Sequence, residues 1–336
     1  MIRRLVFFLL FALAIPAVSQ TTLNGAGATF PNPIYSKWFS DYNKAHPNVQ
    51  INYQPIGSGG GIRQVLAGTV DFGASDGPMT DEQLGQAKIK ILHIPTVLGA
   101  VVPAYHVPGV TEDLKFSPQV IADICLGKIN NWNDKAIAQD NPGVKFPDKP
   151  IVVVHRSDGS GTNYIFTDYL SKVSPEWQSR VGKGTSVKWP VGVGLGAKGN
   201  EGVAGMIRQM EGAFGYVELI YAVQNKIPYG IVRNSAGTWL KGSLEGSTAA
   251  AASVKNMPAD FRVSITNAPG KDAYPISSFT WLLIPTQSKD PAKGKILVDF
   301  LNWMLIEGQK QTAALDYAPL PENVAAKVKE AIKQVR

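Results

Sequence analysis

Apolar residues recur with helical spacing and with strand spacing in alternation along the whole chain. A helical stripe of Ile34, Trp38 and Tyr42 begins directly after Pro31. Further helical patterns cover residues 61–67, 162–173, 203–208, 293–307 and 322–335. Strand patterns cover residues 49–53, 70–74, 93–95, 101–105, 151–155 and 279–285. This alternation predicts an α/β fold, in which helices cover the faces of a sheet.

Residues 237–258 interrupt this pattern, because they are rich in Gly, Ser and Ala. We expect this stretch to lie at the surface, with a short helix as one interpretation of its Ala run. Composition alone marks no domain boundary.

The first residues have the features of a signal peptide. Arg3 and Arg4 precede an apolar run over residues 5–15, and the small residues Ala17 and Ser19 follow it. The run is too short to span a bilayer. We therefore expect residues 1–19 to be cleaved during export.

Charge and cysteine content argue against nucleic acid binding and against an internal disulfide. The net charge is +7, but the basic residues are scattered and form no block of the kind that binds nucleic acid. Cys125 is the single cysteine, so no internal disulfide can form. Its apolar neighbours predict a buried small side chain rather than a nucleophile.

Three segments place small and hydroxyl residues directly before a helical pattern. They run from Gly25 to Pro31, from Gly57 to Gly61 and from Asp158 to Thr162. A helix start offers unpaired N–H groups and a partial positive charge, and glycine lets the backbone approach a ligand closely. Ser58 and Ser160 could each be an ordinary helix cap. Three such segments converging would form an anion site.

Arg156 strengthens the interpretation of an anion site. It follows the apolar strand pattern of residues 151–155, where open α/β sheets bind ligands, and its planar guanidinium suits a tetrahedral oxyanion. The alternative is a surface arginine. Asp158, two residues further on, could hold the guanidinium in place.

Asp76 follows another strand pattern, and a carboxylate is unexpected beside an anion. It could instead cap a helix that begins near Asp81.

Other motifs do not lead to a site. Residues 194–199 match the dinucleotide pattern GxGxxG, but Pro190 and further glycines precede them, so a loop is expected there. The four histidines lack metal-ligand spacing, and no nucleophile elbow surrounds Ser160. No cofactor is predicted.

These segments resemble the periplasmic phosphate-binding proteins of phosphate-specific ABC transporters. The matching strings are GAGATFP from Gly25, IGSGGG from Ile56, VDFGASDGPMT from Val70, RSDGSGT from Arg156, VKWPVGVG from Val187, GAFGYVE from Gly212 and LDYAPLP from Leu315. The resemblance extends over essentially the whole chain after residue 19. The family often has a second serine where this chain has Gly59, so a side-chain contact from that position is missing.

The resemblance implies two α/β lobes that are joined by two crossing strands and close over one phosphate. It implies lobe 1 over residues 20–96 and 271–336 and lobe 2 over residues 97–270. The implied phosphate contacts are Thr29, Phe30, Ser58, Asp76, Arg156, Ser160, Gly161 and Thr162, with Asp158 supporting Arg156. The implied partners are inorganic phosphate and the permease subunits of an ABC transporter, and the chain is expected to be a monomer.

Two rival functions come from the residues themselves. A phosphatase of the cell envelope would need a nucleophile with its base, or metal ligands, and neither is visible. A binder of sulfate or molybdate could use similar helix starts. Asp76 argues against it, because a carboxylate repels an anion that carries no proton.

Overall fold

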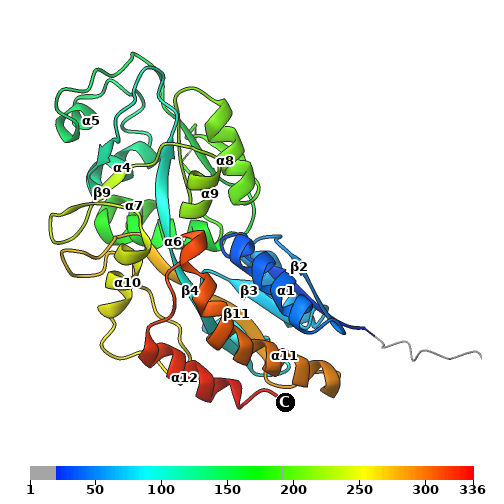
Figure 1. Cartoon of the computed structure of the whole chain (residues 1–336). Helices are drawn as coiled ribbons and strands as arrows, with labels where there is room; N and C mark the ends of the chain where they lie inside the picture. The colour runs from blue at the N-terminus through cyan, green and yellow to red at the C-terminus, as the bar shows by residue number, and fades with distance from the viewer. Residues whose placement is uncertain (1–19, 191) are drawn as a thin grey trace, which may run out of the picture.

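One eight-stranded sheet runs through the whole molecule, which the computed structural model describes over residues 20–190 and 192–336 (Figure 1). The strand order is β2-β1-β3-β11-β4-β8-β6-β7. In chain order these strands are β1 (Thr21–Gly27), β2 (Val49–Gln54), β3 (Phe72–Ser75), β4 (Ile91–Tyr105), β6 (Val152–Arg156), β7 (Leu195–Ala197), β8 (Ala213–Glu218) and β11 (Ser277–Pro285).

Strand β4 belongs to both halves of this sheet. Its first part, residues 91–100, pairs with β11, and its last part, residues 101–105, pairs with β8; both pairings are antiparallel. The two separate strands expected at residues 93–95 and 101–105 are therefore one strand, and that prediction was wrong. All fifteen residues of β4 are buried, so no alternation of polar and apolar positions marks its course.

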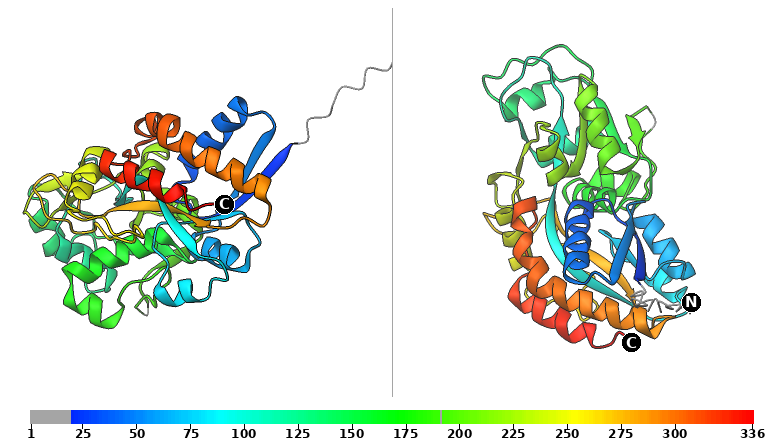
Figure 2. Two further views of the ribbon diagram at one scale, coloured as in Figure 1. Left: turned by 90° about the horizontal axis from the view of Figure 1, so that it is seen from below. Right: turned by 45° about the vertical axis from the view of Figure 1, so that its right-hand side comes forward.

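Two lobes lie on either side of the β4 crossing. In the first, α1 (Asn32–Ala45) and α11 (Pro291–Trp303) cover one face of the sheet, and α2 (Ser58–Ala67) and α3 (Asp81–Gly85) cover the other (Figure 2). In the second, α6 (Gly161–Val173) and α8 (Gly199–Gln209) pack on β4, β6 and β8. The predicted α/β class with two lobes is confirmed. The residues at which the lobes divide stay a prediction, and the first limit, after residue 96, falls inside β4.

The remaining elements are short. They are α4 (Pro118–Cys125), α5 (Lys135–Asp140), α7 (Pro175–Arg180), α9 (Leu219–Gln224), α10 (Leu244–Ala252) and α12 (Glu322–Ile332), and a second sheet of β10 (Trp239–Lys241), β9 (Ile231–Arg233) and β5 (Lys115–Phe116). Helix α10 contains the Ala run, so the interpretation of this run as a short helix is confirmed. None of the described helices is long and apolar enough to cross a membrane.

Two expected boundaries need correction. The segment at residues 194–199 is not a loop, because β7 covers Leu195–Ala197 and α8 begins at Gly199, four residues before the helical pattern was expected to start. The pattern over residues 293–307 contains a change of helix type, since α11 ends at Trp303 and a π-helical turn follows over Met304–Gly308. In that turn the carbonyl of Gly308 accepts a 2.9 Å hydrogen bond from the indole of the buried Trp38.

Cys125 lies in the hydrophobic core, as predicted. Burial raises the pKa of its thiol, so the thiolate that a nucleophile needs is disfavoured.

Helix α2 approaches the sheet at Gly61, where backbone meets backbone. A Cβ atom on Gly61 would lie 2.6 Å from the carbonyl oxygen of Ala26 and 2.7 Å from that of Ala74. Because Gly61 has no side chain, the start of α2 can pack directly against the backbone at the ends of β1 and β3.

We predict opposite effects for two glycine-to-alanine substitutions inside helices. Gly61→Ala should lower the free energy of unfolding by about 1–3 kcal/mol, because the added methyl group forces α2 from the sheet. Gly205→Ala in α8 meets no atom within 4 Å. It should raise the same quantity by about 0.5–1 kcal/mol through helix propensity. Urea unfolding of both variants checks the pair, and equal signs would contradict the packing argument.

Candidate anion-binding site

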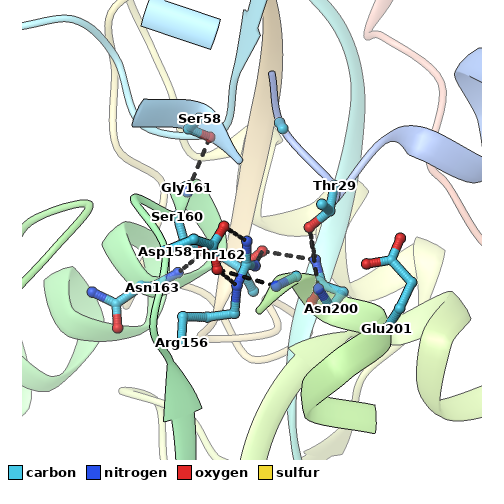
Figure 3. A network of polar contacts seen from close by, with 12 residues as sticks. Thr29, Ser58, Arg156, Asp158, Ser160, Gly161, Thr162, Asn163, Asn200 and Glu201 are labelled. Atoms are coloured by element: carbon cyan, nitrogen blue, oxygen red, sulfur yellow. Dashed lines mark hydrogen bonds and ion pairs between the residues drawn. The ribbon is translucent and has the colours of Figure 1, made fainter. Parts of the chain in front are cut away.

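The three predicted segments meet beside the middle of β4, at the ends of β1, β3 and β6 (Figure 3). Helix α2 begins at Ser58 and α6 begins at Gly161. The two starts touch directly, since the N–H of Gly59 donates to the carbonyl of Gly159 over 2.8 Å and the N–H of Gly161 donates to Ser58 Oγ over 3.0 Å. The structure thus brings the two lobes together at these helix starts.

Glycine makes this contact between the helix starts feasible. Gly57 has φ 87°, and a Cβ atom there would lie 2.7 Å from the carbonyl oxygen of Gly159. A Cβ atom on Gly161 would lie 2.5 Å from both Ser58 Oγ and Asp76 Oδ2. Any larger residue would hold α2 and α6 apart.

Ser58 and Ser160 differ in their local role. Ser160 is the N-cap of α6, where its Oγ accepts the N–H of Asn163 over 3.0 Å. Ser58 does not cap α2, because it is the first helical residue and Gly57 precedes it. Its Oγ accepts instead from the N–H groups of Gly161 and Asp76. Both serines are fully buried.

Arg156 is buried and held by Asp158. Its Nε donates to Asp158 Oδ1 over 2.7 Å and its Nη2 to Asp158 Oδ2 over 2.6 Å, while Nη1 lies 3.3 Å from Thr162 Oγ1. The guanidinium side chain is only 1% exposed, which excludes the alternative of a surface arginine. Burial opposes ionisation of Asp158, but the two bonds from Arg156 outweigh it and hold the pKa of Asp158 below its usual value.

Asp76 does not cap a helix. The N-cap of α3 is Thr80, which forms a capping box with Gln83. Asp76 is 1% exposed, and its Oδ1 accepts a 2.7 Å hydrogen bond from Thr280 Oγ1. Burial raises the pKa of Asp76 to about 7, although the bond from Thr280 and the charge of Arg156 act in the opposite direction.

Thr29 and Phe30 bring the start of α1 into the same space. The ring of Phe30 is fully buried, and its carbonyl accepts a 2.6 Å bond from the hydroxyl of Tyr317. Phe30 can therefore face a ligand only through its N–H. Among the hydrogen bonds of the described residues, the N–H groups of Phe30, Ser58 and Thr162 donate to no protein atom. Each lies at or just before a helix start, where such donors point along the axis.

Three residues near the site were not predicted. Asn200, at the start of α8, donates to Thr29 Oγ1 and to Thr162 Oγ1. The hydroxyl of Tyr221 donates to the carbonyl of Thr29, and Thr280 lies on β11. The glycine pattern at residues 194–199 could have pointed to Asn200, because this segment forms a strand and a turn that lead into the start of α8. Tyr221 and Thr280 come from distant parts of the chain and no local pattern marks them.

The arrangement offers binding groups rather than groups for a reaction. His155 stacks on Trp189 with ring centroids 4.7 Å apart, and its Nδ1 lies 3.1 Å from the carbonyl oxygen of Arg156. It therefore does not activate Ser160. Over the described residues, His, Cys, Asp and Glu form no group that could hold a metal ion.

Comparisons with known proteins identify the family of the chain. The model of the PBP superfamily domain matches residues 14–307. A phosphate-binding protein PstS of Xylella fastidiosa is 48% identical over 318 residues, which cover 93% of this chain and 86% of that protein. The PstS of Haemophilus influenzae is 43% identical over 96% of both chains. The chain belongs to the PstS family of phosphate-binding proteins.

Solved structures of lower identity share the fold of this PstS chain. A high affinity periplasmic phosphate-binding protein bound with phosphate matches with a TM-score of 0.75 at 22% identity, over 92% of this chain and 93% of the other. A putative phosphate ABC transporter substrate-binding protein of Clostridium perfringens matches with a TM-score of 0.64 at 21% identity, over 90% and 100%. The relatives are phosphate-binding proteins, so the expectation of a binding protein rather than an enzyme is confirmed.

The raised pKa of Asp76 has a consequence for stability. Between the ordinary value of 3.8 and about 7, the unfolded chain releases this proton and the folded chain keeps it. The folded state therefore loses stability as pH rises through this window. We predict that Asp76→Asn, in ligand-free protein, raises the free energy of unfolding by about 2–4 kcal/mol at pH 8. Urea unfolding should show this gain shrinking as pH falls towards 4.

Asp158→Asn provides the contrast, since the pKa of Asp158 is lowered. Its carboxylate stabilises the fold above its ordinary pKa, and this contribution is lost as pH falls. At pH 8 the substitution leaves the buried guanidinium of Arg156 without its counter-ion, which should cost about 3 kcal/mol. A gain for Asp158→Asn, or a loss for Asp76→Asn, would contradict this assignment of the two carboxylates.

Proposed function

We propose that this protein binds inorganic phosphate between its lobes and delivers it to an ABC-type importer. The observation that carries the proposal is the combination of the buried guanidinium of Arg156, several unpaired donors at helix starts and the buried carboxylate of Asp76. Thr29, Phe30, Ser58, Arg156, Ser160 and Thr162 are the proposed donors, and Asp76 is the proposed acceptor. Gly161 is a proposed contact that lines the site, while its N–H donates to Ser58 Oγ.

The donors suit an anion that has lost its water. Hydrogen bonds from N–H and O–H groups can replace the hydration shell from several directions. Asp158 neutralises Arg156, so the site carries little net charge and holds the anion largely through dipoles. A protein that must also release its ligand benefits from this balance, because a fully charged pair would be costly to separate.

Asp76 adds a requirement for a proton. Phosphate near neutral pH keeps at least one proton, since its second ionisation lies at roughly pH 6–7. A buried carboxylate can accept a short hydrogen bond from that P–OH group. Sulfate has the same shape but no proton, so an ionised Asp76 would meet it with a like charge. This repulsion disfavours the alternative that the protein binds sulfate.

The cellular setting is part of the same proposal. We propose that the chain is exported through a cleaved peptide at residues 1–19, resides in the periplasm and is a monomer in solution. The pattern of residues 1–19 and the family support this setting. The peptide lies outside the described residues. The permease partner is inferred from the family alone, and no nucleic acid partner is proposed.

Calorimetric titration of the chain from Gln20 onwards tests the proposal. Phosphate and arsenate, which both keep a proton, should bind, and sulfate should not bind at pH 8. Phosphate should also raise the melting temperature by mass action. Absence of phosphate binding by folded protein, or hydrolysis of a phosphate ester that is lost in Ser160→Ala, would overturn it.

Asp76 makes a second, sharper prediction about pH. Because its pKa lies at about 7, a fraction of ligand-free protein carries a protonated Asp76 that can donate to sulfate. We expect weak sulfate binding to appear as pH falls from 8 to 5, while phosphate binding persists. In Asp76→Asn, whose amide donates at every pH, sulfate should bind with little dependence on pH. Sulfate rejection that is unchanged in this variant would refute the role of Asp76.

Arg156 should be the largest single charged contribution. Hydrogen bonds to charged groups contribute about 1.5–3 kcal/mol each, so Arg156→Ala should weaken phosphate binding roughly ten- to a few-hundredfold. Arg180→Ala is the matched control, because Arg180 is 54% exposed and pairs with Glu176 on α7. Its titration should resemble that of the parent. Equal affinity for Arg156→Ala and parent would contradict the proposed contact.

A further inference from the structure

Asn200 occupies a central place in the site although it was not among the predicted contacts. It is fully buried in the first turn of α8. Its Nδ2 donates to Thr29 Oγ1 over 2.9 Å and to Thr162 Oγ1 over 3.0 Å, and its backbone N–H also donates to Thr29 Oγ1, over 3.2 Å (Figure 3). Thr29 follows β1 and Thr162 lies in α6, so Asn200 connects elements from both sides of β4.

The orientation of the Asn200 amide is determined by a backbone group. Its Oδ1 accepts the N–H of Glu218 over 3.0 Å, and a backbone N–H can only donate. The opposite orientation would place an amide NH₂ group against that N–H. The NH₂ end must therefore face the two threonine hydroxyls, and both of its hydrogens are used.

Each threonine oxygen then accepts two hydrogen bonds. Thr29 Oγ1 accepts from the N–H and the NH₂ group of Asn200. Thr162 Oγ1 accepts from the NH₂ group of Asn200 and from Arg156 Nη1. A hydroxyl has two acceptor positions and one hydrogen. With both acceptor positions filled, each threonine can only donate, and its hydrogen must point elsewhere.

We propose that Asn200 is a positioning residue that turns Thr29 and Thr162 into obligate donors towards the bound anion. This inference rests on the proposed function, because it assumes that phosphate lies between these hydroxyls. Without Asn200, either hydroxyl could rotate and present a lone pair to the anion. Asn200 thus acts on the ligand through the two threonines. It makes this side of the site donate hydrogen bonds, whereas Asp76 accepts them.

A double-mutant cycle separates this role from simple packing. Phosphate affinity is measured by calorimetry for the parent, Asn200→Ala, Thr29→Val/Thr162→Val and the triple variant. Asn200→Ala should weaken binding about ten- to hundredfold in the parent. In the valine background, where no hydroxyl remains to be oriented, the same substitution should change affinity by less than about threefold. Equal losses in both backgrounds would overturn the proposal, since additive effects indicate independent roles.

Two further measurements make the cycle decisive. If Asn200→Ala does not fold, Asn200→Asp replaces it, because its carboxylate keeps the shape and still accepts the N–H of Glu218 but cannot donate to the threonines. The part of its loss that disappears in the valine background is the part transmitted through the hydroxyls. Unchanged affinity in either Asn200 variant would refute the role of Asn200 alone, whereas a parent that binds no phosphate would refute the proposed function.

Discussion

The close contact between the starts of α2 and α6 is the constraint on which the rest of the site depends. A dehydrated anion can be held only if hydrogen-bond donors surround it from several directions. Backbone N–H groups are available for this at helix starts, where they have no partner within the helix. Two such starts can share one ligand only if their backbones nearly touch. The contact between Gly59 and Gly159 meets this condition, since a Cβ atom on Gly59 would lie 3.1 Å from the Cα atom of Gly159. Gly59 is therefore one of the positions at which the backbones of the two lobes approach each other closely.

Polarity is the second constraint, because a site that holds phosphate must keep nearly all of its groups as donors. Hydroxyl groups can donate or accept, and they need neighbours that fill their acceptor positions. The N–H groups of Gly161 and Asp76 do this for Ser58, as that of Asn163 does in part for Ser160. Asp76 is the exception, since it is an acceptor. It can still accept a hydrogen bond from a ligand, because Thr280 and Ser58 occupy only part of its carboxylate.

Much of this arrangement could be predicted from the sequence, and the failures have physical causes. The helix starts, Arg156 and Asp158 were identified because local motifs carry them: glycines, a cap and a strand end lie within a few residues. The continuous strand β4 was missed because a strand buried on both faces loses its period of two. Asn200 was missed because Pro190 and the glycines before it favour a loop, although β7 needs only three residues to pair with β6. Thr280 and Tyr221 reach the site only through the fold.

The course of β4 links the site to the crossing between the lobes. Ala100 pairs with Ser277 of β11, and the next residue, Val101, pairs with Glu218 of β8. The N–H of that same Glu218 donates to Asn200, whose amide reaches both threonines. The side chain of Asn200 therefore connects the point where β4 changes its pairing partner with the threonine donors of the site. A rotation of one lobe against the other at this crossing would separate Asn200 from Thr29. It would leave Thr162 in contact with Asn200 and Arg156, which lie in the same lobe. Closure of the lobes would therefore orient the hydroxyl of Thr29, whereas that of Thr162 is oriented in advance.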